Sequence, residues 1–288
     1  MNTALPPYRF IALALLGVLS AVPESAAQTM RSTTVTRQRR GEKEMSARID
    51  FGAGTLTLRP GRSSALYSMN LLYDSERFAP VSRFSATGRQ LDLGVQNIGN
   101  SGLRVSSKRH LQQNAVIELS SQVDLSLDVS SGAVEAGMEL GGLRITEARI
   151  RMAASKSSIR FSQPNQAVCR SLELNAGAAE FEVFMLGNSG CREIRFEGGV
   201  GDVTLDLTGA WPADARLVAK LALGGLTLRL PRELGVALEV DAFLASFDPA
   251  GFTRRGGGYL SDGYETRKRH LKVEITSKVG EVKVEWVD

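Results

Sequence analysis

Histidine, cysteine and aromatic residues are scarce in this chain of 288 residues, which has two His, two Cys and only 6% Phe, Trp and Tyr. Catalytic and metal sites usually need clusters of such residues. The two histidines, His110 and His270, each lie in a basic run that is typical of solvated surface. Gly-x-Ser-x-Gly, His-Glu-x-x-His and Cys-x-x-Cys patterns are all missing. We therefore expect no catalytic residue, no metal site and no cofactor.

Long apolar segments are also missing, since none reaches the roughly 18 continuous apolar residues of a membrane-spanning helix. Residues 1–27 instead predict a secretory signal peptide, with Arg9, an apolar run from Phe10 to Val22 and the small-x-small site Ser25-Ala26-Ala27. We expect cleavage near Ala27 and an extracytoplasmic protein, periplasmic or secreted, without a stable membrane span.

Charge is nearly balanced, with a net charge of +4 and a pI near 9.2. The basic clusters at residues 37–40 and 254–255 have no interleaved aromatic side chains of the kind that stack on nucleotides. We therefore expect no nucleic-acid partner. The composition leaves the partner open, and an envelope protein and a surface glycan are the two classes considered.

The sequence contains one repeated pattern, which we call the phrase, in five copies between Leu125 and Leu230. Each copy has an alternating apolar segment, a Gly, Ala or Ser turn, and a second alternating segment. The first apolar residues after the turn are Val134, Ile159, Phe181, Val203 and Leu226. Alternation marks strands with one buried face, and a fixed period of this length marks a solenoid. We predict an all-β, solenoid-like stack of two-strand coils of about 22–25 residues. Winding as one helix and stacking as hairpins both remain open, because they produce the same alternation.

Outward-facing charges in these copies alternate in sign when the copies are stacked. One column reads Glu135, Arg160 and Glu182, and another reads Arg151, Glu173 and Arg195. Like charges would repel on adjacent strands, so we interpret the columns as solvated ladders that fix the register. A ligand-binding face is the alternative.

Two further patterns have a functional and a structural reading. Glu197, Asp202 and Asp206 could form a carboxylate pair like that of a glycan-cleaving solenoid, but Lys220 and Arg229 on the next coil favour ion pairing. The glycine-rich run at residues 198–202 is followed by a strand rather than a helix, so we interpret it as a turn and not as a phosphate loop.

The two cysteines occupy equivalent positions in consecutive copies, because Cys169 and Cys191 each lie twelve residues before the first apolar residue of the second segment. Stacked strands bring such Cα atoms to about 5 Å, which a disulfide tolerates. We predict a disulfide between neighbouring coils. The alternative is two free thiols that pack together.

The remaining chain divides by composition. Residues 28–46 are polar and are expected to form a flexible leader. Residues 47–120 are expected to form an N-terminal antiparallel β cap that opens with a copy of the phrase around Leu56. Residues 121–240 hold the solenoid repeats, 241–270 an aromatic and glycine-rich insertion, and 271–288 terminal strands that close the array around Val282.

The insertion is the candidate interaction loop, because it concentrates aromatic and basic residues beside three consecutive glycines. A lid over the last coil is the other interpretation. The residues concerned are Phe243, Phe247, Phe252, Arg254, Arg255, Tyr259 and Tyr264.

Several glycine-containing phrases, read in order, resemble the bacterial toast-rack family. They include Phe51 to Leu58, Leu140 to Leu143, Phe196 to Leu205 and Gly257 to Tyr259. The middle and end are also similar to the proposed-adhesin solenoids and to the C-terminal part of LiaF-type envelope-stress regulators, although the membrane helices of the LiaF type are missing. The resemblance implies a solenoid-like fold in a secreted or envelope protein without assigned catalytic residues.

Taken together, these features favour a non-enzymatic, exported envelope protein that acts as a structural or adhesin-like interaction solenoid. One alternative is a glycan-binding or glycan-cleaving solenoid. A second alternative is a regulator of an envelope-stress sensor that acts through the insertion.

Overall fold

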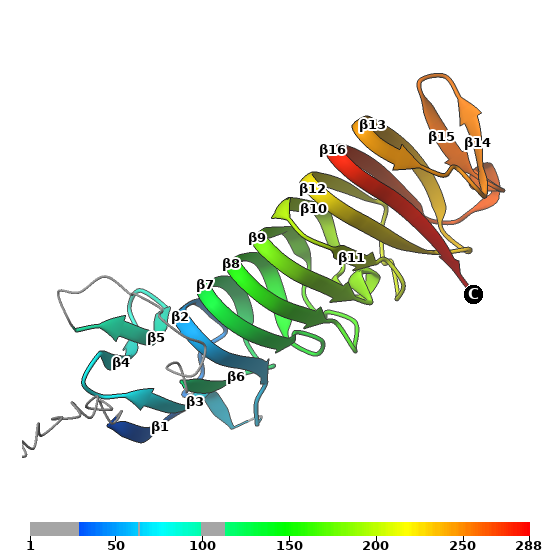
Figure 1. The fold of residues 1–288 in the computed structure, drawn as a ribbon. Helices are drawn as coiled ribbons and strands as arrows, with labels where there is room; N and C mark the ends of the chain where they lie inside the picture. The colour runs from blue at the N-terminus through cyan, green and yellow to red at the C-terminus, as the bar shows by residue number, and fades with distance from the viewer. Residues whose placement is uncertain (1–28, 63, 99–112) are drawn as a thin grey trace, which may run out of the picture.

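The computed structural model describes residues 29–62, 64–98 and 113–288, so the expected signal peptide and His110 lie outside the described residues. The described chain is all-β, as predicted, and its strands form one continuous sheet wound along a single axis (Figure 1). Its elements are β1 (Met30–Gln38), β2 (Glu44–Pro60), β3 (Ala65–Asp74), β4 (Phe78–Ser85), β5 (Gln90–Asn97), β6 (Asn114–Leu119), β7 (Asp124–Glu139), β8 (Arg144–Arg160), β9 (Cys169–Phe184), η2 (Leu186–Ser189), β10 (Cys191–Val200), β11 (Val203–Asp206), β12 (Ala215–Pro231), β13 (Gly235–Phe247), β14 (Phe252–Arg255), β15 (Gly258–Ser261), η3 (Tyr264–Thr266) and β16 (His270–Val287).

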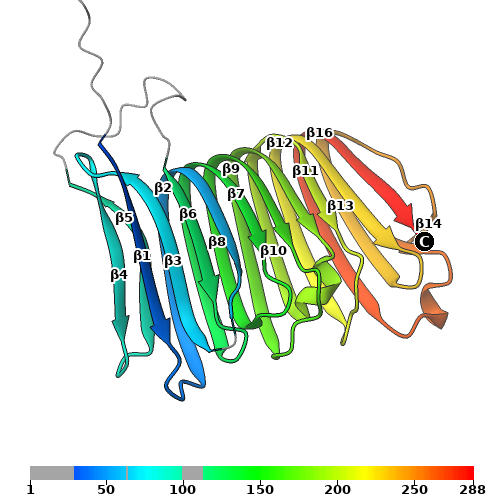
Figure 2. The same ribbon diagram turned by 90° about the horizontal axis from the view of Figure 1, so that it is seen from below.

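Most of the sheet consists of rungs, by which we mean the parallel levels β2, β7, β8, β9, β10 with β11, β12, β16 and β13, in that spatial order. Each rung bends at a corner near its middle, so that its two halves face each other across the core (Figure 2). Inward side chains alternate with outward ones along each half. The largest side chains in this core are fully buried and include Phe51, Phe161, Phe181 and Phe196. Burial of each such side chain contributes about 1.5–3 kcal/mol to the stability of the fold.

The predicted register is correct in the C-terminal half of the stack. One inward row pairs Phe181 with Val203, Val203 with Leu226, and Leu226 with Val282. In the N-terminal half the same row continues through Ser157, Ala136 and Leu56. Val134 and Ile159 therefore lie outside this row, and their assignment to it was wrong.

The reason for the error is local. Ser157 is a buried polar residue at the inward position of this row. The first apolar residue after the turn, Ile159, is therefore one inward position further along the strand than the row itself. A bulge between Leu125 and Ser126 also shifts the pairing of β7 with β8 by one residue.

The charge columns change with the register. Glu182 lies opposite Ser158 and Arg160 opposite Phe184, so the expected column of Glu135, Arg160 and Glu182 is wrong. In the second column Glu173 faces Arg195 as predicted, but its other neighbour is Arg149 rather than Arg151.

Glycine is required at the corners because the backbone of one rung approaches that of the next. Gly224 and Gly280 have φ values of 129° and 136°, a region that L side chains rarely adopt. A Cβ at Gly224 would overlap the carbonyl oxygen of Gly201, and one at Gly280 would overlap that of Gly224. In the run 198–202, residues 198–200 belong to β10 and lead into such a corner, and the strand β11 follows at Val203.

The N-terminal region differs from expectation in two ways. Residues 28–46, the expected flexible leader, contain the edge strand β1 and the start of β2. β1 pairs antiparallel with β3, and Arg37 lies over the Phe84 ring at 4.3 Å. Backbone pairing therefore orders a segment whose side chains are mostly polar.

The expected antiparallel cap is a mixed structure. β1, β3 and β6 pair antiparallel, as do β4 and β5. β2, however, is a complete rung parallel to β7, and β5 and β6 each run parallel to one half of β2. The stack thus begins at β2, earlier than predicted.

The C-terminal order also differs. β16 was expected to close the array but lies between β12 and β13, with parallel pairing on both sides (Figure 1). Residues 241–247, assigned to the insertion, are the second half of β13, and the rest of the insertion forms the β14–β15 hairpin and η3. The C-terminal strand has the same apolar alternation as the other rungs, so it can pair between two rungs as well as at the end of the stack.

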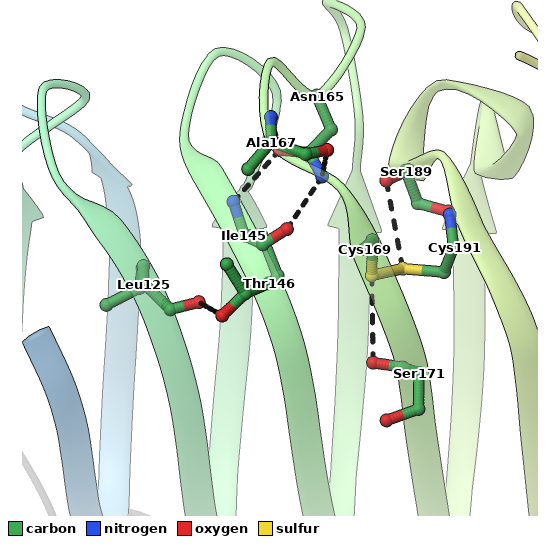
Figure 3. The surroundings of a disulfide bond; sticks show 9 residues. All are labelled: Leu125, Ile145, Thr146, Asn165, Ala167, Cys169, Ser171, Ser189 and Cys191. Atoms are coloured by element: carbon green, nitrogen blue, oxygen red, sulfur yellow. Dashed lines mark hydrogen bonds between the residues drawn. A yellow bond between two sulfur atoms is a disulfide. The ribbon is translucent and has the colours of Figure 1, made fainter. Parts of the chain in front are cut away.

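Cys169 and Cys191 are bonded to each other in the structure (Figure 3). They lie in register at the first positions of β9 and β10, with Cα atoms 4.4 Å apart. Both side chains are buried. The bridge therefore joins two adjacent rungs in the middle of the stack.

Candidate interaction surface

Aromatic side chains close the C-terminal end of the core. Phe247 of β13 contacts Tyr259 of β15 with ring centroids 5.3 Å apart, and Phe252 of β14 contacts Trp286 of β16 at 5.1 Å. The Trp286 Nε1 donates a hydrogen bond to the Ala250 carbonyl oxygen at 2.9 Å. Three of the predicted loop residues thus pack over the last rungs in the way that a lid would.

The other predicted loop residues have different surroundings. Tyr264 packs on His270 at 4.6 Å, and its carbonyl oxygen lies 3.1 Å from the His270 Nε2. Arg255 forms an ion pair with Glu265, whereas Arg254 is exposed. Phe243 lies apart from the lid, on β13, with 80% of its surface exposed. The seven residues therefore do not form one site.

A row of exposed apolar side chains follows the corner of the C-terminal rungs, and we call Val200, Leu223, Val279 and Leu244 the apolar ridge. Val200 pairs with Leu223, Leu223 with Val279, and Val279 with Leu244, so they occupy four consecutive levels. Their exposed fractions are 52%, 46%, 38% and 66%. Contiguous exposed apolar surface of this kind is typical of interaction sites.

The same row holds alanine in the preceding rungs, with Ala178 in β9 and Ala154 in β8. The ridge is thus specific to the C-terminal half and is not a requirement of the corner itself. It was missed from the sequence because its residues stand beside the corner glycines and read as part of the turn. A comparison of the same position in every copy would have found it.

Several charged side chains on the flat faces form ion pairs between adjacent rungs. Arg149 Nε lies 2.7 Å from the Glu173 carboxylate, and Arg151 pairs with Asp128 at 2.6 Å. The hydrogen bond from Arg149 lowers the pKa of Glu173. These contacts fit the ladder interpretation, in which the charges select the register.

Two of the three carboxylates considered for glycan cleavage accept backbone hydrogen bonds. Glu197 lies in β10 opposite Lys220, while Asp206 lies in β11, beyond the corner, and accepts a hydrogen bond from the Thr208 N–H at 2.9 Å. Asp202 accepts one from the Gly225 N–H at 3.2 Å. Arg229, which faces Asp206, forms its ion pair with Glu285. Within the described ranges, no group of three His, Cys, Asp or Glu residues is placed to hold a metal ion.

A hollow of about 440 Å³ lies between the turn after β11 and the end of the insertion, and sequence reasoning missed it. Trp211 forms part of its wall and donates its Nε1–H to the Leu207 carbonyl oxygen at 2.8 Å. Arg267, Lys268 and Arg269 also line it, together with one carboxylate, Glu233. An aromatic wall beside three cations suits an acidic ligand.

The fold and this surface define a β-solenoid-like stack with a lateral apolar ridge and an aromatic lid over part of its C-terminal end. Residues 25–168, half of the chain, match the family described as the N-terminal domain of toast_rack, DUF2154. The chain belongs to the toast-rack family, as its glycine-containing phrases predicted. No curated protein matches it.

Several solved structures are similar over most of the chain. A proposed cell adhesion protein from Clostridium sporogenes is 15% identical and covers 90% of this chain and 100% of its own, with a TM-score of 0.48. A proposed adhesin from Bacteroides fragilis is 12% identical and covers 90% and 98%, with a TM-score of 0.43. Over the residues that the structure describes, no helix is long and apolar enough to cross a membrane.

Proposed function

We propose that this protein is a non-enzymatic, exported solenoid that acts as a structural or adhesin-like interaction element of the cell envelope. The observation that carries the proposal is the apolar ridge, which exposes large side chains on four consecutive rungs where the preceding rungs have alanine. Export is supported by the sequence of residues 1–27 and by the disulfide, which is typical of oxidising compartments.

The test is capture of envelope proteins by the mature chain, with Leu223→Lys and Val279→Lys combined to place charges on the ridge. The matched control is Ala154→Lys combined with Ala178→Lys, which puts the same two charges in the same row of the two preceding rungs. We expect the wild type and the control to capture an envelope protein that the ridge variant does not. That envelope protein, once purified, should bind directly to the wild type. Retention of the same envelope proteins by the wild type, the ridge variant and the control would contradict the proposal.

A glycan-binding function is the second candidate, and the hollow beside Trp211 favours it. Sugar rings stack on aromatic side chains, and Arg267, Lys268 and Arg269 would attract the acidic groups of a polysaccharide. Titration with an acidic and a neutral polysaccharide tests this function. Binding of the acidic polymer that Trp211→Ala weakens would support it, and equal binding by the two proteins would exclude this hollow.

A further inference from the structure

The last rung of the stack has an open edge. β13 pairs with β16 from Gly235 to Phe247 except at Phe243, but on its other side β15 pairs only with Ala237 and Leu238. A groove of about 560 Å³ separates the rest of β13 from the hairpin, with Val240 and Gly257 among its lining residues. Among the described residues, no strand pairs with this side of β13 from Glu239 onward.

Backbone groups of β13 point into that opening. The Gly235 N–H donates to the Arg269 carbonyl oxygen on the β16 side, whereas the Val236 N–H donates to Ser261 Oγ on the opposite side. Successive residues of a strand direct their N–H and C=O groups to opposite edges. The N–H and C=O of Val240 therefore face the open side, where an added strand would accept and donate hydrogen bonds.

The side chains of this edge do not protect it from pairing. Proteins usually guard free edges with charges or proline. At the N-terminal end β1 has Arg31 and Arg37, and β4 has Pro80 and Arg83. The open segment Val240–Phe247 has one charged residue, Asp241, and no Lys, Arg or Pro, and Glu239 just before it forms an ion pair with Lys272 of β16.

The open segment is also complementary to itself. Phe243 and Leu244 are its two central residues, and they are 80% and 66% exposed. If two copies were related by a two-fold axis at this centre, Phe243 of each would lie against Leu244 of the other, and Asp241 would face the uncharged Ser246. A guarded N-terminal edge offers no comparable match for head-to-tail stacking, and two-fold dimers are the commonest assemblies.

We infer that two copies of the protein associate by antiparallel pairing of their β13 segments, Val240–Phe247, about a two-fold axis near Phe243 and Leu244. This pairing goes beyond the proposed function, because it uses the open edge of the last rung and can occur without any envelope partner.

Sedimentation equilibrium of the mature chain over about a hundredfold range of concentration tests the pairing. The variants are Phe243→Lys, which places a guarding charge on the open edge, and Leu223→Lys, its matched control. Leu223 is also exposed and apolar, but its strand, β12, is paired on both sides. We expect a wild-type dimer whose Kd rises at least about tenfold in Phe243→Lys and changes little in Leu223→Lys.

Cross-linking gives a second measurement that does not depend on affinity. Leu244→Cys places a thiol beside the expected axis, so oxidation should join two chains, whereas Leu223→Cys should stay monomeric on a denaturing gel. A wild type that is monomeric throughout, a dimer unaffected by Phe243→Lys, or linkage through Leu223→Cys instead of Leu244→Cys would each overturn the inference. Loss of envelope capture in the ridge variant with an intact dimer would show that the two surfaces act separately.

Discussion

Removal of the Cys169–Cys191 bridge should destabilise the protein by about 3 kcal/mol, the value expected from the chain entropy of a ring that spans 22 residues. The perturbation is the double variant Cys169→Ala with Cys191→Ala. Both side chains are buried at the first positions of adjacent rungs, so the substitutions introduce no polar group into the core. In a stack, stability is nearly a sum of contributions from rungs and neighbouring interfaces, so the loss should concentrate at β9 and β10.

Urea unfolding followed by circular dichroism measures the effect. The wild type in excess reductant should lose the same free energy of unfolding as the double variant, and reductant should not change the double variant. Agreement of these two losses separates the cross-link from the small packing defect that the alanines leave.

A loss below about 1 kcal/mol in both experiments would refute the reasoning, because the bridge would then not restrict the unfolded chain as supposed. Alkylation gives an independent check on the bond itself. Labelling of both thiols in the unfolded, unreduced protein would show that the bridge is not formed.

Three further predictions concern the stack itself. Gly224→Ala should cost at least about 2 kcal/mol in urea unfolding, since its Cβ would overlap the Gly201 carbonyl at a positive φ; Gly137→Ala, where a Cβ meets no atom, should cost little. Asn188→Ala should cost about 2 kcal/mol, because buried Asn188 donates to the Phe161 carbonyl oxygen and accepts from the Ala210 N–H. The pKa of Glu173 is lowered in the folded state, so its contribution is present above the ordinary value of 4.5 and is lost as the pH falls through the lower folded value. Arg149→Gln should reduce that loss, by less than about 1 kcal/mol because the pair is partly exposed; equal pH profiles in the two proteins would contradict this.

The sequence predicts those parts of the fold in which neighbouring copies hold the same kind of residue, cysteine or large apolar, at the equivalent position. The two cysteines are such a case, and so is the row from Phe181 to Val282. The predicted register is wrong at Ser157, where the inward position is polar, and in β7, where Val134 is buried one inward position before Ala136. Apolar alternation alone locates a strand but tolerates a shift by two residues.

The order of the rungs is harder to predict than their existence. The rungs β12, β16 and β13 have apolar residues in the same rows, so β16 matches β12 and β13 equally well and its position between them leaves no mark in the sequence. The strand β1 was missed for a related reason, because an edge strand is held by backbone pairing and needs few apolar side chains. The lid residues and the apolar ridge could be separated only once β13 was known to extend to Phe247.

Stacking also determines where this protein can interact. An interior rung satisfies its backbone groups on both edges, and its flat faces hold side chains that pair with their neighbours, such as Arg149 with Glu173. Among the described residues, the large exposed apolar side chains and unpaired strand edges of the rungs lie at corners and ends. The N-terminal end is guarded by Arg31 and Pro80, whereas the C-terminal half has both an exposed apolar corner and an open strand edge. The asymmetry between the two ends is therefore the feature that a solely structural spacer would not need, and it favours an interaction role for the C-terminal rungs.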